Sequence, residues 1–391
     1  MEHRGRARLK DVAAAAGLSS ATVSLILNET SDRFPPATVA RVRAAAESLG
    51  YTPNAAARSL RTNTTHTLGV LTDNILTTSS GYAMIQGMQD AAWERDFLML
   101  FIDIDGEQVQ RAKAIAELQA RQVDGLLVGA MYHRPIGTDS LPAAIPTVGF
   151  NAVVPGVACF VPDDLAAGRE VTQLLIDHGH SRIVHLTEYP TDGLARDLRV
   201  RGFRQALEAA GIEGGRVLSQ TTDHPDSQSD AAELLTTELL TGPEPPTGIF
   251  AFNDLMAQGI YRAASTLGVR IPDDLSVVSI DNRQHVAEEL RPGLTTLALP
   301  HYEIGKLSAD RVLDALESGE PIPAEVVRVP FTMVERGSVA APGLGSAADA
   351  SPYRPTSLAL GSDGINVDHT GRLAGPELGE CGGAVLPAGG E

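Results

Sequence analysis

Short apolar runs alternate with amphipathic segments of helix length through most of this 391-residue chain, from about residue 66 to about residue 338. This alternation predicts β-α-β units, which build parallel sheets covered by helices on both faces. It repeats on either side of about residue 160, which predicts two similar doubly wound subdomains. The predicted strands are 68–72, 97–102, 124–128, 146–149, 182–187, 247–252 and 275–280, and the predicted helices are 82–95, 108–121, 166–178, 198–210, 228–240, 255–267 and 302–317.

A different pattern occupies residues 9–50, where three short helices are expected. Gly17 supplies a left-handed residue that ends the first helix. Ser19 is a favourable N-cap type for a second helix over 20–28, and Pro36 suits the first turn of a third. The second helix has a polar amino-terminal end that is free to enter the major groove of DNA. The expected apolar stripes are Val12, Ala13 and Ala16, then Val23, Ile26 and Leu27, then Val39, Val42, Ala46 and Leu49.

The charge of the chain is distributed unevenly. Residues 1–62 contain nine basic and five acidic side chains, a net charge of about +4, in a chain whose net charge is −18. The remaining residues therefore carry about −22. This asymmetry is typical of a nucleic-acid-binding end joined to a soluble body, although a three-helix subdomain with a chance excess of basic residues remains the alternative.

With these patterns in place, the sequence resembles the lactose-repressor family of bacterial transcription regulators, also called the galactose-repressor (LacI/GalR) family. The resemblance spans roughly residues 8–338. It implies a small all-α helix-turn-helix domain followed by an α/β sensor of the periplasmic-binding-protein type. The motifs that carry it are LKDVAAAAGLSSATVSLILN (9–28), LGYTPNAAARSLR (49–61), IFAFNDLMAQGIY (249–261) and IPDDLSVVSIDN (271–282).

In that family the second helix reads the major groove, and a hinge helix after the Tyr-x-Pro-Asn element folds in the minor groove. Leu60 matches the family's leucine that opens a central base step. Carried over by position, the base contacts are Ser20, Ala21 and Leu25, the phosphate contacts are Thr22, Ser24, Asn28 and Asn54, and Tyr51 and Ala57 complete the DNA-binding set. The family often has arginine where this chain has Leu25, which cannot make a bidentate guanine contact. Apolar contacts and indirect readout are therefore expected to carry more of the specificity.

The expected hinge also makes sense from its own residues. Residues 54–61 are too few to form a stable helix in water. Ala55, Ala56 and Ala57 would let two such helices approach closely, so hinge folding would depend on DNA and on dimer geometry. The alternative for Leu60 is a linker leucine that packs on its own domain.

Candidate effector residues follow from the rule that ligands of doubly wound sheets bind at the carboxyl ends of strands. Asp73 and Asn74 follow the first predicted strand, and Ser80 precedes the helix after it. Asn253 and Asp281 follow two later strands. Asn253 could instead simply cap the next helix, and Asp254 is expected to be mainly structural.

The resemblance adds two further candidates. Arg199 heads an Arg-x-x-Gly-aromatic motif whose arginine usually contacts effector, and Asp164 lies near another frequent polar ligand position. A surface salt bridge is the alternative for Arg199. Carboxylates and amides with one arginine suit the hydroxyl pairs of a sugar or nucleoside. Trp93 lies on a predicted helix face and is expected in the core.

The sequence therefore predicts a sequence-specific DNA-binding transcriptional regulator of the repressor type. Its operator affinity would be controlled by an effector held in the cleft between the subdomains. The effector could act as inducer or as co-repressor. The expected domains are the helix-turn-helix domain at 1–50, the hinge and linker at 51–65, the sensor at 66–338 and a disordered tail at 339–391. The tail shows no sustained leucine heptad, so a homodimer is expected.

Two other classes of protein are less compatible with the sequence. A solute-binding protein without a regulatory role would need an export signal and would not need residues 1–61. An enzyme is not expected, because no phosphate-binding glycine loop and no Gly-x-Ser-x-Gly elbow is present.

No cofactor, metal or membrane partner is expected. His180 is read as part of a helix-ending turn with Gly179, and the scarcity of cysteine fits a reducing cytoplasm.

Overall fold

The computed structural model describes residues 7–28, 33–52, 59, 64–77, 81–104, 108–139, 141–188, 193–220 and 228–343. The side chain of Asn28 and the predicted site residues Asn54, Ala57, Leu60 and Ser80 lie outside this description. Most of the expected hinge and residues 344–391 of the expected tail lie outside it as well.

The amino-terminal domain contains α1 (Leu9–Ala16), α2 (Ser20–Asn28) and α3 (Pro36–Ser48). Gly17 ends α1 with a φ of 64°, and the Ser19 hydroxyl accepts a hydrogen bond of 3.1 Å from the Thr22 amide at the start of α2. Val12, Val23, Ile26 and Val42 are among the residues that form its buried core. The expected place of Leu49 in this core is wrong, because Leu49 follows the last residue of α3 and is 40% exposed.

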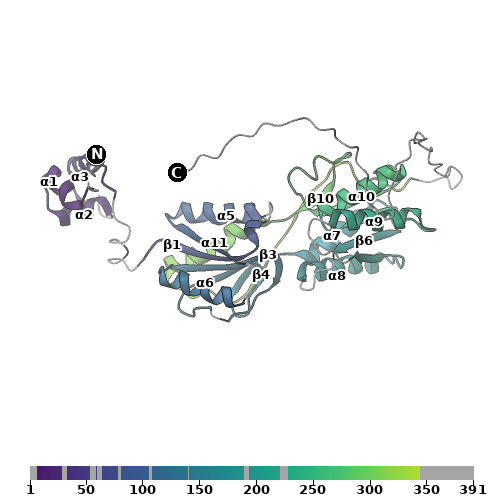
Figure 1. The fold of residues 1–391 in the computed structure, drawn as a ribbon, viewed down its shortest axis with the longest axis horizontal. Helices are drawn as coiled ribbons and strands as arrows, with labels where there is room; N and C mark the ends of the chain where they lie inside the picture. The colour runs from purple at the N-terminus through teal and green to yellow at the C-terminus, as the bar shows by residue number, and fades with distance from the viewer. Residues whose placement is uncertain are drawn as a thin grey trace, which may run out of the picture. The chain divides into compact units, whose positions relative to one another are not determined.

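The first subdomain is built on a sheet with strand order β11-β5-β4-β3-β1-β2. Helices α5 and α11 cover one face of this sheet and α6 covers the other (Figure 1). All of its paired strands are parallel. Its elements are β1 (Thr67–Asp73), the 3-10 helix η2 (Ile75–Thr77), α5 (Gly81–Glu94), β2 (Leu98–Ile104), α6 (Gln108–Ala120), β3 (Gly125–Pro135), β4 (Thr147–Val153), β5 (Ala158–Pro162), α11 (His301–Ser318) and β11 (Val326–Val329).

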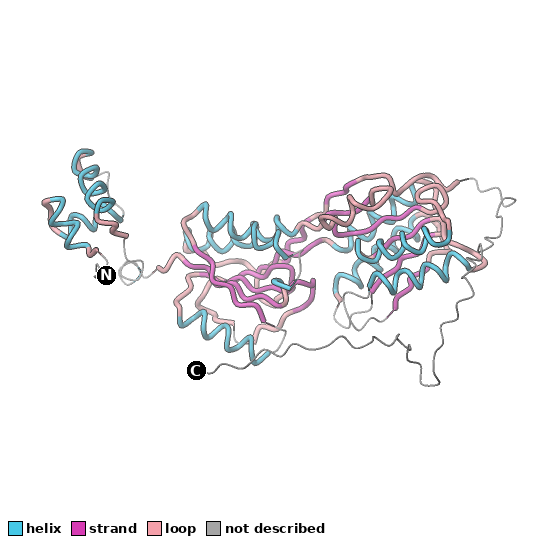
Figure 2. The backbone as a smooth tube through the Cα atoms, turned by 45° about the horizontal axis from the view of Figure 1, so that its top comes forward, coloured by secondary structure: helices cyan, strands magenta, loops and turns pink. Residues whose placement is uncertain are grey.

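The second subdomain is built on a sheet with strand order β12-β10-β9-β8-β6-β7, in which only the pair β10 and β12 is antiparallel. Helices lie between several of the successive strands in both subdomains, while β3, β4 and β5 in the first and β9 and β10 in the second succeed one another in the element order (Figure 2). Its elements are α7 (Asp164–Asp177), β6 (Ile183–Glu188), α8 (Leu194–Ala209), β7 (Arg216–Gln220), α9 (Gln228–Thr241), β8 (Gly248–Ala251), α10 (Asp254–Leu267), β9 (Ser276–Asp281), β10 (Thr295–Ala298) and β12 (Thr332–Val334).

The predicted doubly wound architecture is confirmed, with two differences along the chain. The chain does not divide once near residue 160, because α11 packs against α5 and β11 pairs with β5 in the first sheet. Residues 339–343, assigned to the tail from sequence, continue the second subdomain instead. There the Ala340 carbonyl accepts hydrogen bonds from the His180 ring and the Ser276 hydroxyl, at 2.9 and 3.0 Å.

A buried histidine lies in the core of the second subdomain. The His185 ring stacks on Phe250 with ring centres 3.9 Å apart, and its Nδ1 lies 3.0 Å from the Phe250 carbonyl oxygen. Burial lowers the pKa of His185 from 6.5 to about 3, and the nearby Arg199 and Arg196 charges act in the same direction. The ring is therefore neutral in the folded protein under mildly acidic conditions.

This histidine is expected to make stability fall as the pH falls. Below pH 6.5 the unfolded chain binds a proton at His185 that the folded chain does not bind until about pH 3. The loss should approach about 1.4 kcal/mol per pH unit in that window. In urea unfolding between pH 7 and pH 4.5, His185→Phe should lose stability less steeply than the wild type by up to this amount. Identical slopes would contradict the assignment of a neutral buried ring.

Candidate functional site

The amino-terminal domain presents one face of α2 to solvent. Ser20, Ala21 and Leu25 are exposed, and Leu25 is 46% exposed although it is a large apolar side chain. Val23 and Ile26 on the opposite face are buried. The three residues predicted to contact bases are therefore accessible on one side of a short helix, as a major-groove reader requires.

The other predicted DNA contacts are arranged differently. Thr22 and Ser24 are half-buried, and the Thr22 hydroxyl lies 2.8 Å from the Ser19 hydroxyl. Tyr51 is half-buried and packs against the core of the domain, and its amide donates to the Ala46 carbonyl at 2.9 Å. Tyr51 therefore has a packing role here, and contact with DNA remains a prediction for it.

The first polar cluster of the sensor lies at the end of β1. Asp73 is nearly buried and forms an ion pair with Arg134 from the end of β3. Asn74 adopts a positive φ of 60° and its side-chain amide donates to Asp73 at 3.1 Å. The Asp103 carboxylate accepts hydrogen bonds from the Ile75 and Leu76 amides, which holds the loop after β1 in place. The structure brings the predicted residues Asp73 and Asn74 together with Arg134, which was not selected from the sequence, and their contact with effector stays a prediction.

The second cluster joins residues from both subdomains. Arg199 from α8 donates from Nε to Oδ1 of Asp164 at 2.8 Å, and from Nη1 to the Phe252 carbonyl at 2.8 Å. The guanidinium also lies over the Phe252 ring, 4.4 Å from its centre. The second carboxylate oxygen of Asp164 lies 2.7 Å from Nδ1 of His133 on β3. Asp164, Arg199 and His133 are all buried.

The electrostatics of this cluster centre on Asp164. Burial raises the pKa of its carboxyl, but the Arg199 charge and the hydrogen bond from His133 outweigh burial, so the net pKa lies below its ordinary value. Asp164 also occupies the first turn of α7, where the helix dipole favours a negative charge. The alternative interpretation of Arg199, a salt bridge on the surface, is therefore wrong, because Arg199 is buried. Asp164 already has a partner on each oxygen, so it holds other residues in place.

Residue His133 was not selected from the sequence, because β3 was expected to end at residue 128. The strand instead continues past an irregularity between Gly129 and Arg134 to Pro135. Asn151 braces this extension, since its buried side-chain amide donates to the Ala130 and Met131 carbonyls at 2.9 and 2.7 Å. A longer strand would have placed His133 at a carboxyl end, where the same rule selects ligand residues.

The remaining predicted effector residues lie at the ends of β8 and β9. Asn253 caps α10, because its side-chain oxygen accepts from the Met256 amide at 2.9 Å, and its amide donates to Gln228 at 2.8 Å. Asp281 has a φ of 134°, which is rare for a residue with a side chain, and lies 3.8 Å from Arg283. Strained backbone of this kind occurs often at ligand clamps. The capping alternative therefore describes Asn253, and Asp281 stays a candidate.

Asp254 has the structural role expected from sequence. It is fully buried and accepts hydrogen bonds from the Ser279 hydroxyl, from the Thr296 hydroxyl at 2.9 Å and from the Arg283 amide at 2.6 Å. Burial raises the pKa of Asp254 above its ordinary value in spite of these donors. Asp254 thereby ties α10 to β9, to β10 and to the loop after Asp281.

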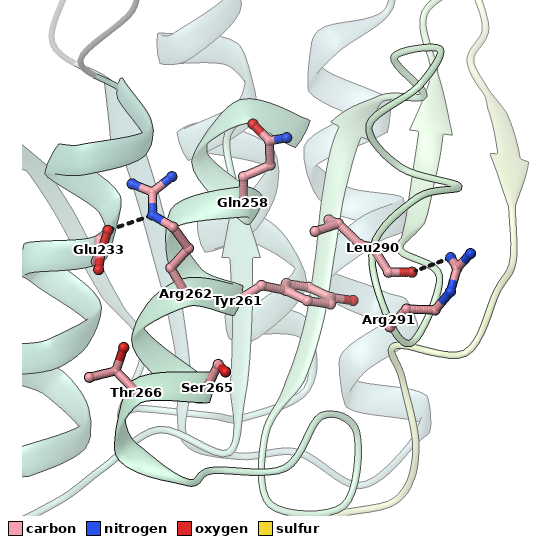
Figure 3. Close-up of a pocket in the computed structure, with 8 residues that line it drawn as sticks. All are labelled: Glu233, Gln258, Tyr261, Arg262, Ser265, Thr266, Leu290 and Arg291. Atoms are coloured by element: carbon pink, nitrogen blue, oxygen red, sulfur yellow. Dashed lines mark hydrogen bonds and ion pairs between the residues drawn. The ribbon is translucent and has the colours of Figure 1, made fainter.

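A surface depression of about 560 Å³ lies elsewhere, on the α9 and α10 side of the second subdomain (Figure 3). Arg262 on its wall already pairs with Asp230 and Glu233 at 2.7 and 2.6 Å, and Arg291 donates to the Leu290 carbonyl at 2.9 Å. None of the predicted effector residues lines it, so it is not the candidate site. Its lining residues are Glu233, Gln258, Tyr261, Arg262, Ser265, Thr266, Leu290 and Arg291.

Within the described residues, no group of three or more His, Cys, Asp or Glu side chains is arranged to hold a metal ion. In the same residues, no single helix is long and apolar enough to cross a membrane. The helices α1 and α2 meet the length and hydropathy criteria only when they are taken together, and they are bent by 102° relative to each other.

Comparison with known protein families gives two matches. Residues 8–54 match the family described as bacterial regulatory proteins, lacI family, and residues 172–339 match a periplasmic binding protein-like domain. The chain is 32% identical over 339 residues to the ribose operon repressor of Escherichia coli strain K12, which covers 85% of this chain and 99% of that protein. It is 34% identical over 338 residues to the transcriptional regulator CelR of Thermobifida fusca, covering 82% and 96%.

Solved structures agree with this assignment. A LacI-family regulator from Rhizobium etli is 31% identical, has a TM-score of 0.64, and the match covers 70% of this chain and 99% of that one. The lac repressor dimer bound to operator and an anti-inducer has a TM-score of 0.70 over 86% of this chain and all of that one, and its 24% identity supports the fold alone. The long matches to the ribose operon repressor and CelR, together with the amino-terminal family match, show that the chain belongs to the lacI family of bacterial regulatory proteins.

Proposed function

We propose that this protein is a transcriptional repressor that binds operator DNA sequence-specifically as a homodimer, with an affinity controlled by a small sugar or nucleoside. The effector would lie between the two subdomains. The observation that carries the proposal is the combination of two sites on one chain. The exposed face of α2 suits a major groove, and buried charged side chains gather at the ends of β1, β3 and β8.

The chemistry of the sensor residues supports a polyhydroxylated effector. Arg199 supplies donors beside the Phe252 ring, and Asp73 and Asp281 supply carboxylate acceptors. Charged groups at strand ends with one aromatic face are suited to sugars and nucleosides. Solved relatives include CelR in complex with cellobiose, at 28% identity, and a LacI-family regulator from Enterococcus faecium with bound ribose, at 26% identity.

The DNA-binding part of the proposal is tested by deletion. The full chain should enrich a pseudo-palindromic sequence from a library of random DNA duplexes, because two copies of α2 read two half-sites. The chain without residues 1–63 should enrich no sequence and should keep the folded sensor, as its circular dichroism would show. Equal enrichment by both proteins would contradict the proposal. So would a full chain that binds DNA without sequence preference.

The dimer is proposed to form through the outer face of α5. Trp93 was expected in the core, but it is 63% exposed, and Tyr82 three turns earlier on the same face is 67% exposed. Leu98 at the start of the edge strand β2 is 65% exposed. Two large aromatic residues on one helix face beside an unpaired strand edge are typical of a subunit interface. The fold-related lac repressor was solved as a dimer.

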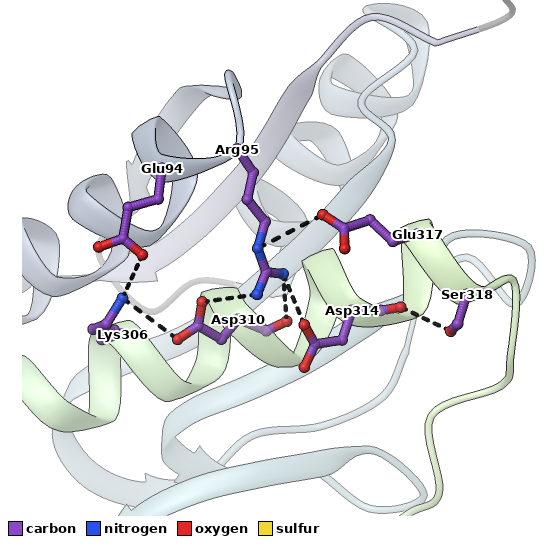
Figure 4. A network of polar contacts seen from close by, with 7 residues as sticks. All are labelled: Glu94, Arg95, Lys306, Asp310, Asp314, Glu317 and Ser318. Carbon is purple, nitrogen blue, oxygen red and sulfur yellow. Dashed lines mark hydrogen bonds and ion pairs between the residues drawn. The ribbon is translucent and has the colours of Figure 1, made fainter.

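The neighbouring side of α5 is already occupied by charged contacts with α11 (Figure 4). Arg95 pairs with Asp314 at 2.8 Å and also contacts Asp310 and Glu317, while Lys306 pairs with Glu94 at 3.0 Å. These contacts lie between helices of the same subdomain. The Trp93 side of α5 is therefore the side left for a second copy of the chain.

Trp93→Glu should convert the dimer to a monomer, because it places a charge in an apolar interface. Light scattering after size-exclusion chromatography should show a mass near 41.1 kDa instead of about twice that value. Leu234→Glu is the matched control, since Leu234 is a 60% exposed apolar residue on α9. A variant at Trp93 that stays dimeric, or a control that dissociates equally, would refute the proposed interface.

A further inference from the structure

The two ring nitrogens of His133 differ in their surroundings. Nδ1 lies 2.7 Å from the Asp164 carboxylate, and both side chains are buried. Nε2 is also buried, but it has no hydrogen-bond partner among the residues that the structure describes. Buried polar atoms almost always have a partner, which is a protein group, a water or a ligand. Nε2 of His185 also lacks a partner among these residues, but that ring is stacked on Phe250 inside the core of the second subdomain. His133 lies instead near the carboxyl end of β3, where the two subdomains meet through Asp164. At this place the unpartnered nitrogen points to a group that the protein chain does not supply.

The partners of Asp164 fix which nitrogen of His133 carries the hydrogen. An ionised carboxylate only accepts hydrogen bonds, so Nδ1 of His133 must be the donor. Arg199 already balances the charge of Asp164, and a protonated His133 would bury a second cation beside it. In its neutral form the ring then has a hydrogen on Nδ1 and a lone pair on Nε2. The unpartnered atom is thus an acceptor, and it needs a donor.

The location of this acceptor connects it with the effector. Asp164 holds Nε of Arg199 on one oxygen and Nδ1 of His133 on the other. A single carboxylate thereby orients a donor group from the second subdomain and an acceptor from the first. A ligand hydroxyl is the simplest group that can serve both, because it accepts through its oxygen and donates through its hydrogen.

We propose that His133 is a specificity-determining residue that accepts a hydrogen bond at Nε2 from a hydroxyl group of the effector. This inference rests on the proposed sugar or nucleoside effector and deepens it. Asp164 is the positioning residue that selects the acceptor form of the ring. A site that hydrogen-bonds a hydroxyl rejects an analogue without it, because a buried polar group is then left unpaired. The effector must therefore carry a free hydroxyl at this point, which rules out a methoxy or deoxy group there.

The test uses the full chain and a panel of D-ribose, D-xylulose, cellobiose and the common ribonucleosides, each with its monodeoxy analogues. Thermal shift identifies the compounds that bind, and calorimetry gives their dissociation constants. His133→Asn keeps a donor near the position of Nδ1 and removes the Nε2 acceptor. His185→Asn is the matched control, because His185 is an equally buried histidine whose Nδ1 faces the Phe250 carbonyl in the core.

The wild type should lose about tenfold to a hundredfold in affinity for one deoxy analogue of the bound sugar. His133→Asn should bind the parent sugar more weakly by a similar factor, and should no longer distinguish it from that analogue. His185→Asn should keep the wild-type preference. If the sugar binds wild type and His133→Asn equally, the role of His133 is wrong while the proposed function stands. If no compound stabilises the wild type, the proposed effector class is contradicted, and this inference falls with it.

A second measurement tests the ring directly and needs no ligand. In nitrogen-15 NMR of histidine-labelled protein, Nε2 of His133 should have the chemical shift of an unprotonated nitrogen. In the Asp164→Asn variant, Nε2 should instead have the chemical shift of a protonated nitrogen. Arg199 can only donate, so the new amide must direct its oxygen to Arg199 and its nitrogen to His133. That arrangement makes Nδ1 the acceptor and places the hydrogen on Nε2. A protonated Nε2 in the wild type, or an unprotonated Nε2 in the variant, would overturn the assignment.

Discussion

Asp164→Ala is expected to destabilise the protein by about 3 to 5 kcal/mol, because it leaves a buried guanidinium without its carboxylate. Arg199 is 3% exposed, so water cannot replace the lost partner without opening the structure. The Nδ1 hydrogen of His133 would lose its acceptor in the same substitution. The free energy of unfolding from urea titration at pH 7 measures the effect.

The neighbouring residue provides a control for this prediction. Asp163 is the N-cap of α7 and accepts a hydrogen bond of 3.2 Å from the Ala166 amide. Asp163→Ala should cost about 1 kcal/mol, the usual value for a lost cap. If Asp164→Ala costs no more than Asp163→Ala, the buried charge cluster does not hold the subdomains as described. Asp164→Ala in an Arg199→Met background should cost much less, since the unpaired charge is then gone.

Gly305→Ala should destabilise the protein by about 2 to 3 kcal/mol, although alanine in a helix is normally about 1 kcal/mol better than glycine. Gly305 lies inside α11 where this helix meets α5. A Cβ at this position would lie 2.1 Å from the Met84 carbonyl oxygen, which is backbone and cannot turn aside. Gly87 on α5 makes the reciprocal close approach to Tyr302, so both helices would have to separate.

The sign of this change distinguishes close helix packing from helix propensity. Gly214→Ala is the control, because the nearest atom to an added Cβ there is the Ser181 carbonyl oxygen at 3.9 Å. Its unfolding free energy should change by less than about 1 kcal/mol. A Gly305→Ala variant that is as stable as the wild type, or more stable, would show that α5 and α11 do not pack this closely.

The sequence predicted the elements whose signals are local. Helices and buried strands of the body were found within four residues of their observed ends, apart from β3, because each has a full period of apolar residues. The strands β5, β7, β10, β11 and β12 were missed. They have three to five residues, and such short runs carry little periodicity.

The candidate site was only partly predictable, because its assembly depends on tertiary contacts. Strand-end position selected Asp73 and Asp281, and the family motif selected Arg199. Residues His133 and Arg134 were missed, since the extension of β3 is stabilised by Asn151 from the neighbouring strand. No sequence pattern reveals that Asp164 has both oxygens occupied. Trp93 was misplaced because periodicity does not separate a core face from an exposed apolar face.

The central claim is that an effector between the subdomains controls the affinity of the amino-terminal domain for DNA. The direct measurement is the dissociation constant of the full chain for the duplex selected from the random library, at fixed salt, with and without a saturating sugar that stabilises the protein. The dissociation constant should change by at least about fivefold, because allosteric coupling energies are typically 1 to 3 kcal/mol. An unchanged dissociation constant with the sensor fully occupied would contradict it.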